Sequence, residues 1–170
     1  MKPGSRVLLT VALTVCCIGP AVAEDAPACA GFAWSVARDR AAFTAPDLAG
    51  LASGSALPGG TGAAQVSLKP AAEVTLPVQS ERTAKPGTFA GFITATVPSA
   101  GTYQLTLSEE AWIDVSQDGR TTLKPERISG KAGCPEIRKS LRFALDAGPV
   151  TIEIGRAPSQ QIKLDLLPAE

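Results

Sequence analysis

From about Gln65 to the C-terminus, apolar and polar residues alternate along the chain with a period of two. The residues between the apolar positions are largely polar, as at Arg142, Thr151 and Lys163. This alternation is typical of β-strands that turn one face to a core and the other face to solvent. The apolar positions fall in seven runs: Val66 and Leu68; Val74, Leu76 and Val78; Tyr103, Leu105 and Leu107; Ile113 and Val115; Leu141, Phe143 and Leu145; Val150, Ile152 and Ile154; Ile162, Leu164 and Leu166.

Turn signals separate these runs, and a longer apolar strand is expected at residues 88–97. The turns are PSAG at residues 98–101, QDG at 117–119 and DAG at 146–148. Several short strands at near-regular spacing, each with one apolar face, favour an antiparallel sandwich of two sheets. The sequence therefore predicts an all-β fold, with residues 65–170 forming a single antiparallel, jelly-roll-like β-sandwich. A closed barrel is the alternative.

Residues 24–64 have a different composition, rich in Ala, Gly, Pro and Ser. A short helix is expected at residues 36–43, with Ser35 as its N-cap. Phe43, together with Trp34, would face the body of the protein. Residues 46–64 lack large side chains apart from leucine and predict a long, loose connection.

The first 23 residues have the pattern of a signal peptide. Lys2 and Arg6 precede an apolar run at residues 7–18, and Ala-Val-Ala at residues 21–23 supplies the small residues that signal peptidase requires. The run is too short to span a bilayer. We therefore expect cleavage before Glu24 and a periplasmic or secreted protein. A buried N-terminal helix is the alternative.

The chain has four cysteines, two of which would leave with the signal peptide. Neither Cys16 nor Cys17 follows a small residue, as a lipoprotein signal would require. Cys29 and Cys134 remain as an even pair, which predicts one disulfide in an oxidising compartment. A metal site or a reactive thiol is the alternative interpretation, although two cysteines without histidine make a poor metal site.

The charge balance excludes some partners. Sixteen basic residues balance sixteen acidic residues, and loss of Lys2 and Arg6 would leave the mature chain near −2. No basic stripe is present, which argues against nucleic-acid binding. Because the sequence has neither a cationic amphipathic helix nor a second long apolar run, we expect no membrane partner and no membrane span.

The strand around Trp112 contains the candidate ligand-binding residues. If Ile113 and Val115 face the core, Trp112 and Asp114 face outward, shortly before the turn at Asp118. An aromatic ring beside a carboxylate suits a sugar ring, which stacks on the indole and donates a hydrogen bond. The alternative is that the N-terminal loop, or the helix near Trp34, covers this face.

Acidic residues cluster around the same strand. Glu109, Glu110, Asp114 and Asp118 could together supply carboxylate oxygens to a calcium ion. Their spacing is not that of a dedicated calcium loop, so ordinary solvated turn charges are the alternative interpretation. Apart from this candidate calcium ion, no cofactor is expected.

A basic row follows Cys134. Arg138, Ser140 and Arg142 share the strand face opposite Leu141. Pairing of this row with Glu153 and Asp165 on neighbouring strands is the expected arrangement, and anion binding is the alternative. Lys139 and Ser140 point to opposite faces of a strand, which argues against a Ser-Lys nucleophile.

The runs GTYQLTLSEEAWIDVSQDG and CPEIRKSLRFALDAGPVTIEI, with CAGFAW at residues 29–34, resemble a group of small secreted alphaproteobacterial proteins. Some members carry the name homogentisate 1,2-dioxygenase. The strand order also resembles pre-peptidase C-terminal and jelly-roll accessory modules. The resemblance implies a small exported β domain.

The chain contains no histidine. The dioxygenase name implies iron held by two histidines and a carboxylate, so it cannot apply to these residues. Histidine-based triads and general bases are excluded as well, which leaves only a glycosidase-type carboxylate pair as candidate catalytic chemistry. We therefore expect a non-catalytic module that binds a glycan or a protein surface in the cell envelope. The alternative is a structural or envelope-stress protein without a small ligand.

Overall fold

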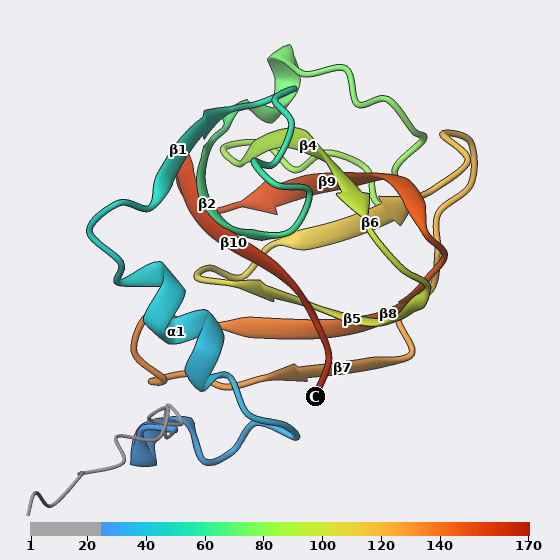
Figure 1. Cartoon of the computed structure of the whole chain (residues 1–170). Helices are drawn as coiled ribbons and strands as arrows, with labels where there is room; N and C mark the ends of the chain where they lie inside the picture. Colours follow the sequence, from blue (N-terminus) through green and yellow to red (C-terminus); the bar gives the residue numbers. More distant parts are fainter. Residues whose placement is uncertain (1–24) are drawn as a thin grey trace, which may run out of the picture.

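A computed structural model describes residues 25–170 as two β-sheets packed face to face (Figure 1). The six-stranded sheet has the order β1-β2-β10-β5-β8-β7, and the four-stranded sheet has the order β3-β4-β9-β6. This arrangement confirms the predicted all-β sandwich. The strands are β1 (Ala49–Ala52), β2 (Gly62–Ser67), β3 (Lys69–Pro70), β4 (Phe89–Val97), β5 (Gly101–Leu107), β6 (Trp112–Ser116), β7 (Arg127–Gly130), β8 (Lys139–Leu145), β9 (Gly148–Ala157) and β10 (Gln161–Pro168).

The chain crosses from one sheet to the other at most of the steps between successive strands, as in a jelly roll. It passes from β4 to β5 and β6, and later from β8 to β9 and β10, changing sheets each time. All strand pairs are antiparallel except β1 with β2. Between β6 and β7, residues 117–126 contribute only one bridge to the four-stranded sheet, Val115 to Leu123. The sandwich is therefore incomplete on the side where β6 and β7 are edge strands.

The main core lies between the sheets and is built from the alternating apolar positions. Leu105, Ile152, Ile154 and Leu164 are fully buried in it. Tyr103 is also buried, and its hydroxyl donates to the carbonyl of Ser99 at 3.0 Å, which satisfies its polar end. The period-two pattern thus identified the inward face of most strands correctly.

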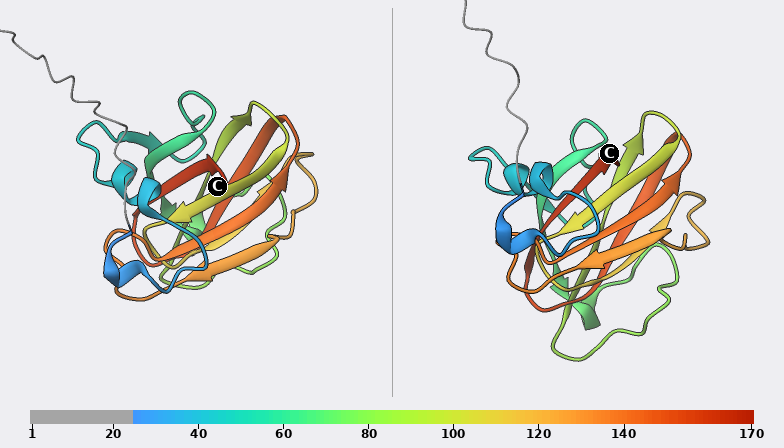
Figure 2. Two further views of the ribbon diagram at one scale, coloured as in Figure 1. Left: turned by 60° about the horizontal axis from the view of Figure 1, so that its bottom comes forward. Right: turned by 90° about the horizontal axis from the view of Figure 1, so that it is seen from below.

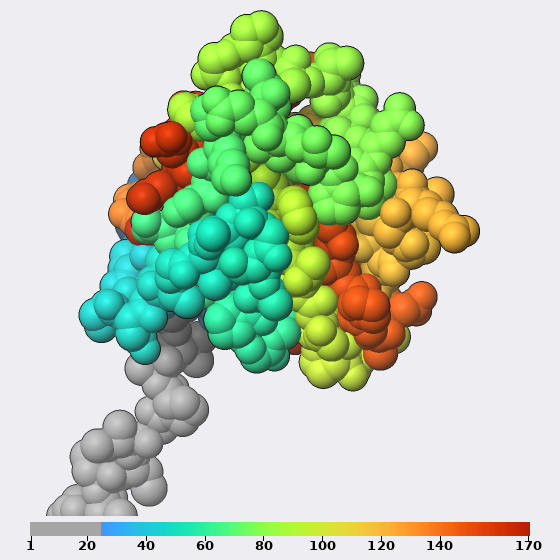
Figure 3. All heavy atoms as spheres, turned by 90° about the horizontal axis from the view of Figure 1, so that it is seen from above, coloured from blue at the N-terminus to red at the C-terminus, as the bar shows by residue number. Residues whose placement is uncertain are grey.

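Three segments differ from the expectation. Residues 74–78 form no strand. Instead the short 3₁₀ helix η2 (Ala71–Glu73) leads into a segment, residues 74–88, that crosses the outside of the four-stranded sheet (Figure 3). Pro77 lies inside this run and has no N–H to donate to a ladder. In addition, β1 and β7 are strands that the sequence did not predict, and β1 lies inside the expected loose connection.

The N-terminal segment packs against the outer face of the six-stranded sheet (Figure 2). It contains the 3₁₀ helix η1 (Pro27–Cys29) and the helix α1 (Ala37–Phe43), which begins one residue later than predicted. The predicted disulfide between Cys29 and Cys134 is present, with a sequence separation of 105. It forms a second apolar cluster with Val36, Phe43 and Ile137.

The expected signal peptide, residues 1–23, lies outside the described residues. Across residues 25–170, no helix combines the length and the apolar composition needed to cross a bilayer. The disulfide indicates an oxidising, non-cytoplasmic compartment.

Candidate functional site

Trp112 lies at the start of β6, on the outer face of the four-stranded sheet, as predicted. Its indole is half-buried. The guanidinium carbon of Arg82 lies 4.8 Å from the ring centroid, and the ammonium nitrogen of Lys139 lies 6.0 Å from it. The segment that covers this face is residues 74–88, not the N-terminal loop or the helix near Trp34. The indole of Trp112 is thus partly covered by this segment, and two cations lie beside its ring.

Asp114 anchors the covering segment to the sheet. Its Oδ1 accepts from the indole N–H of Trp112 at 2.9 Å. Its Oδ2 accepts from the Ser80 hydroxyl at 2.6 Å and from the Glu81 backbone N–H at 3.3 Å. The directly opposite residue on β9, Glu153, accepts from the Val78 N–H at 2.6 Å. Both carboxylates are buried, and burial raises the pKa of Glu153, with the charge of Asp114 adding to the shift. Asp114 therefore holds the indole and residues 78–81 in place.

Two hollows meet at Trp112. One, of about 180 Å³, opens where the sandwich is incomplete between β6 and β7. Its floor includes Leu141 of the core, and its rim includes Glu81, Lys124 and Lys139. The other hollow, of about 90 Å³, lies toward Arg82 and Gly155. We call the larger one the Trp112 pocket. It combines one aromatic ring with charged groups of both signs.

Asp118 does not contribute to this pocket. It lies in the exposed turn after β6, where its oxygens accept from the N–H groups of Arg120 and Thr121, each at 2.8 Å, and from the Thr121 hydroxyl at 2.7 Å. These bonds, led by the Thr121 N–H, hold the pKa of Asp118 well below its usual range. Asp118 thus stabilises a turn, and its expected share in a ligand site with Trp112 and Asp114 stays a prediction.

The four acidic residues proposed as calcium ligands are not brought together. Glu110 forms ion pairs with Arg138 at 3.1 Å and Lys139 at 3.6 Å. Glu109 lines a different groove. Among residues 25–170, no three acidic, cysteine or histidine side chains gather into a group that could hold a metal ion.

The basic row of β8 is placed as predicted, but its partners differ. Arg142 donates to the side-chain oxygen of Gln104 at 3.2 Å, and Ser140 accepts from the indole N–H of Trp34 at 2.9 Å. The predicted pairing with Glu153 and Asp165 is wrong. Glu153 lies in the other sheet, and Asp165 lies beneath α1, where the N-terminal segment covers it.

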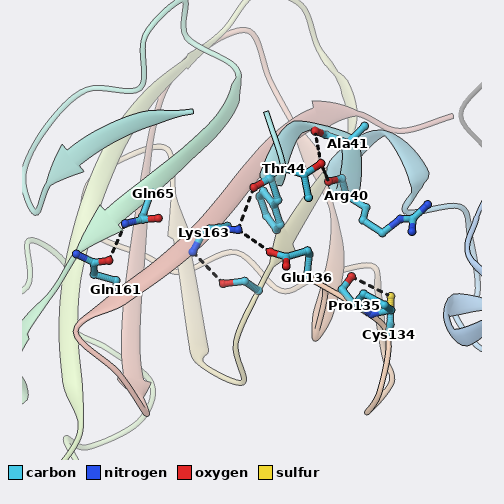
Figure 4. A network of polar contacts seen from close by, with 11 residues as sticks. Arg40, Ala41, Thr44, Gln65, Cys134, Pro135, Glu136, Gln161 and Lys163 are labelled. Atoms are coloured by element: carbon cyan, nitrogen blue, oxygen red, sulfur yellow. Dashed lines mark hydrogen bonds and ion pairs between the residues drawn. The ribbon is translucent and has the colours of Figure 1, made fainter. Parts of the chain in front are cut away.

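A polar groove of about 320 Å³ lies beside β10 (Figure 4). The ammonium of Lys163 donates to the Phe43 carbonyl at 2.9 Å and pairs with Glu136. Gln65 donates to Gln161 at 2.6 Å. These groups bind one another. The contacts of Lys163 connect the end of α1 to β10 and to the loop after Cys134.

Two carboxylates are buried beneath α1. Asp39 of α1 is 1 % exposed and Asp165 of β10 is 0 % exposed. Gln104 donates to one oxygen of Asp39 at 2.8 Å, whereas both oxygens of Asp165 are buried without a hydrogen-bond partner. Burial raises the pKa of Asp165 to about 7, and the nearby charge of Asp39 adds to the shift. Burial raises the pKa of Asp39 as well. Because this pair is sealed from solvent, it is not presented to a substrate.

Comparisons with known proteins do not assign this chain to a family. No protein-family model matches the sequence, and no curated protein matches it. Among solved structures, the chain is similar to a cycloisomaltooligosaccharide glucanotransferase from a Paenibacillus species, seen in complex with cycloisomaltoheptaose. The two are 21 % identical over 50 % of this chain and 13 % of that chain, with a TM-score of 0.29. A likeness this slight has no bearing on function. The expected kinship with small secreted proteins stays a prediction.

Sequence reasoning missed several residues of the Trp112 pocket. Glu81 belongs to a run that was expected to follow a strand, as does Arg82 of the smaller hollow, and Lys124 lies in an irregular loop without periodicity. Ile128 stands at the rim of the pocket and is 59 % exposed. In the sequence, the only signal for an edge strand at this place is a single isoleucine among polar and turn-forming residues.

We expect Asp114→Ala to release residues 74–88 from the sheet. The indole N–H and the Glu81 N–H lose their acceptor, which costs about 2 kcal/mol of unfolding free energy. Urea unfolding measures this loss, and trypsin cleavage after Arg82 should become faster. Asp146→Ala, at an exposed turn, is the control. An unchanged cleavage rate in Asp114→Ala would show that Asp114 is no anchor.

Proposed function

We propose that this protein is an exported, non-catalytic β-sandwich module that binds a glycan at the Trp112 pocket. The observation that carries the proposal is the half-buried indole of Trp112 between two hollows, at the side where β6 and β7 are edge strands. A sugar ring offers an apolar face to an indole and hydroxyls to the charged groups at its edge.

The side chains around the indole suit this role. Asp114 fixes the indole by its N–H, so the ring is already oriented before a ligand arrives. Lys124 and Glu81 are exposed at the rim, where they can exchange hydrogen bonds with hydroxyl groups. The guanidinium of Arg82 occupies part of the ring surface, but an exposed cation–π contact is worth only about 0.5–1 kcal/mol. A sugar ring can therefore displace it at small cost.

The pocket is small for a complete ligand. Pockets that enclose drug-sized ligands have volumes of about 300–1,000 Å³, whereas the two hollows measure about 180 and 90 Å³. We infer that a single sugar ring of a longer chain is held. A module of this kind attaches to a polymer and leaves cleavage to other proteins, in line with a chain that has no histidine.

Trp112→Ala is expected to weaken binding of the recognised oligosaccharide at least about tenfold, because the stacking surface is lost. A thermal-melt screen against neutral envelope and plant oligosaccharides identifies that sugar, since a ligand at 100 times its Kd adds about 2.7 kcal/mol of stability. Trp112→Phe keeps an aromatic face and should retain most of the affinity.

Fluorescence assigns the binding to the pocket. The chain has two tryptophans, so in a Trp34→Phe background only Trp112 responds. A sugar that shifts the melting temperature of the wild type and of Trp112→Ala equally would place binding elsewhere. No response to any oligosaccharide would favour the structural protein without a small ligand.

A further inference from the structure

The outer face of the six-stranded sheet carries a second tryptophan with two cations. The guanidinium carbon of Arg142, on β8, lies 4.6 Å from the ring centroid of Trp34, and that of Arg127, on β7, lies 5.5 Å from it. Trp34 is held by its N–H bond to Ser140. The neighbouring Ala33 N–H donates to Ser129 of β7 at 2.9 Å. Three strand residues therefore contact the indole above β7 and β8, and Ser129 holds the backbone beside it.

The two arginines are direct cross-strand partners in the β7–β8 register. Like charges in directly opposite positions destabilise a sheet, and cross-strand positions favour opposite charges. Neither arginine has an ion-pair partner among residues 25–170. The sheet thus keeps two positive charges together at some cost to its own stability.

The donors of this pair are largely uncommitted. Arg142 gives one N–H to Gln104, while its Nε is buried without an acceptor. The carboxylate of Asp39 is reached from Arg142 only through Gln104. Glu126, next to Arg127 in sequence, accepts from the Thr102 hydroxyl at 3.3 Å. The buried Nε of Arg142 cannot reach a ligand, so the donors open to an acceptor from outside are those of the exposed Arg127 and the remaining N–H groups of Arg142.

We propose that Trp34, Arg127 and Arg142 form a second binding site, which takes an oxyanion carried on a ring-shaped molecule. A guanidinium group presents parallel N–H donors that match a carboxylate, sulfate or phosphate group bidentately. The indole supplies the surface for the ring. An acidic saccharide unit has both parts. This site lies on the outer face of the six-stranded sheet, whereas the Trp112 pocket opens between the edges of the two sheets, and it does not depend on the glycan proposed there.

Fluorescence of Trp34 in a Trp112→Phe background tests the site, with melting temperature as a second readout. The probes are sodium sulfate, sodium phosphate, glucuronate and an oligogalacturonide, each against sodium chloride at equal ionic strength. We expect at least one oxyanion to change Trp34 emission and to raise the melting temperature. Inorganic anions and glucuronate binding equally would identify a simple oxyanion site, and preference for the oligogalacturonide would identify an acidic glycan.

Arg127→Gln is the decisive variant, because Arg127 is exposed on an edge strand and its loss also removes the like-charge contact. It should fold at least as stably as the wild type and bind the anion roughly tenfold or more weakly. Arg120→Gln, at an exposed turn, is the matched control and should bind normally. The proposal is overturned if no probe acts beyond chloride, or if Arg127→Gln binds as well as Arg120→Gln.

Discussion

Reducing the Cys29–Cys134 disulfide is expected to lower the melting temperature by roughly 10 °C or more. The bond closes a loop with a sequence separation of 105. Chain-entropy arguments assign a loop of about that length roughly 3–5 kcal/mol. For a domain of this size, each kcal/mol corresponds to a few degrees. The loss should fall first on the N-terminal segment, because the disulfide lies in the apolar cluster that joins Phe43 and Val36 to the sheet.

Differential scanning calorimetry with and without a phosphine reductant measures this effect. The double variant Cys29→Ser, Cys134→Ser should melt at the temperature of the reduced protein and should not respond to the reductant. Hydrogen exchange of residues 36–43 should rise more than that of β9 in the reduced protein. Equal melting of the oxidised and reduced protein would show that packing alone holds the N-terminal segment.

Raising the pH from 5 to 8 is expected to destabilise the folded protein by about 2–3 kcal/mol, or roughly 5–10 °C in melting temperature. Burial raises the folded-state pKa of Asp165 to about 7, well above the usual value of about 3.9 for an aspartate. Between these values the folded state binds more protons than the unfolded state. The stabilisation is therefore complete below about pH 4 and is lost as the pH rises through 7. Asp39 shifts in the same direction.

The chain has no histidine, so no imidazole titrates in this interval and the carboxylates set the slope. Asp165→Asn should remove most of the pH dependence and should melt above the wild type at pH 8. Asp146→Asn, at an exposed turn, should keep the slope of the wild type. The wild-type melting temperature could instead stay constant from pH 5 to 8, or Asp165→Asn could keep the wild-type pH dependence. Either result would show that Asp165 does not set the pH dependence of stability.

The strands could be predicted from the sequence because their inward positions alternate without interruption. Leu141, Phe143 and Leu145 illustrate the point, since each lies in the core and the residues between them face outward or lie at the edge. The run at Val74 and Leu76 has the same period, but Pro77 interrupts its hydrogen bonding and the segment lies across a sheet. A period of two in the apolar positions does not by itself distinguish a β-strand from an irregular segment that packs against a sheet.

The edge strands β1 and β7 could not be predicted, because each has four residues and includes glycine. Such strands carry weak signals. The disulfide could be predicted, because only two cysteines remain after the expected signal peptide and no other pairing exists for them.

The candidate sites were predicted in part. The placement of Trp112 and Asp114 on the face of β6 away from the core follows from the alternation with Ile113, although Asp114 is buried there. The role of Asp114 did not follow, because it depends on residues 78–81 folding back over the sheet. Asp165 is an outward polar position in the alternation, so it was expected in solvent. Only the packing of α1 against β10 shows that it is buried.

The pairing of β2 with β10 has a consequence for how the chain folds. β2 begins at Gly62 and β10 ends at Pro168, and their register joins the two ends of the domain in the middle of the six-stranded sheet. A sheet of such high contact order folds slowly, because a long loop must close before its contacts form. Because β10 follows the other strands along the chain, the six-stranded sheet cannot be completed until β10 has been synthesised. The strands that precede β10 therefore stay without their completed sheet until β10 pairs with β2 and β5.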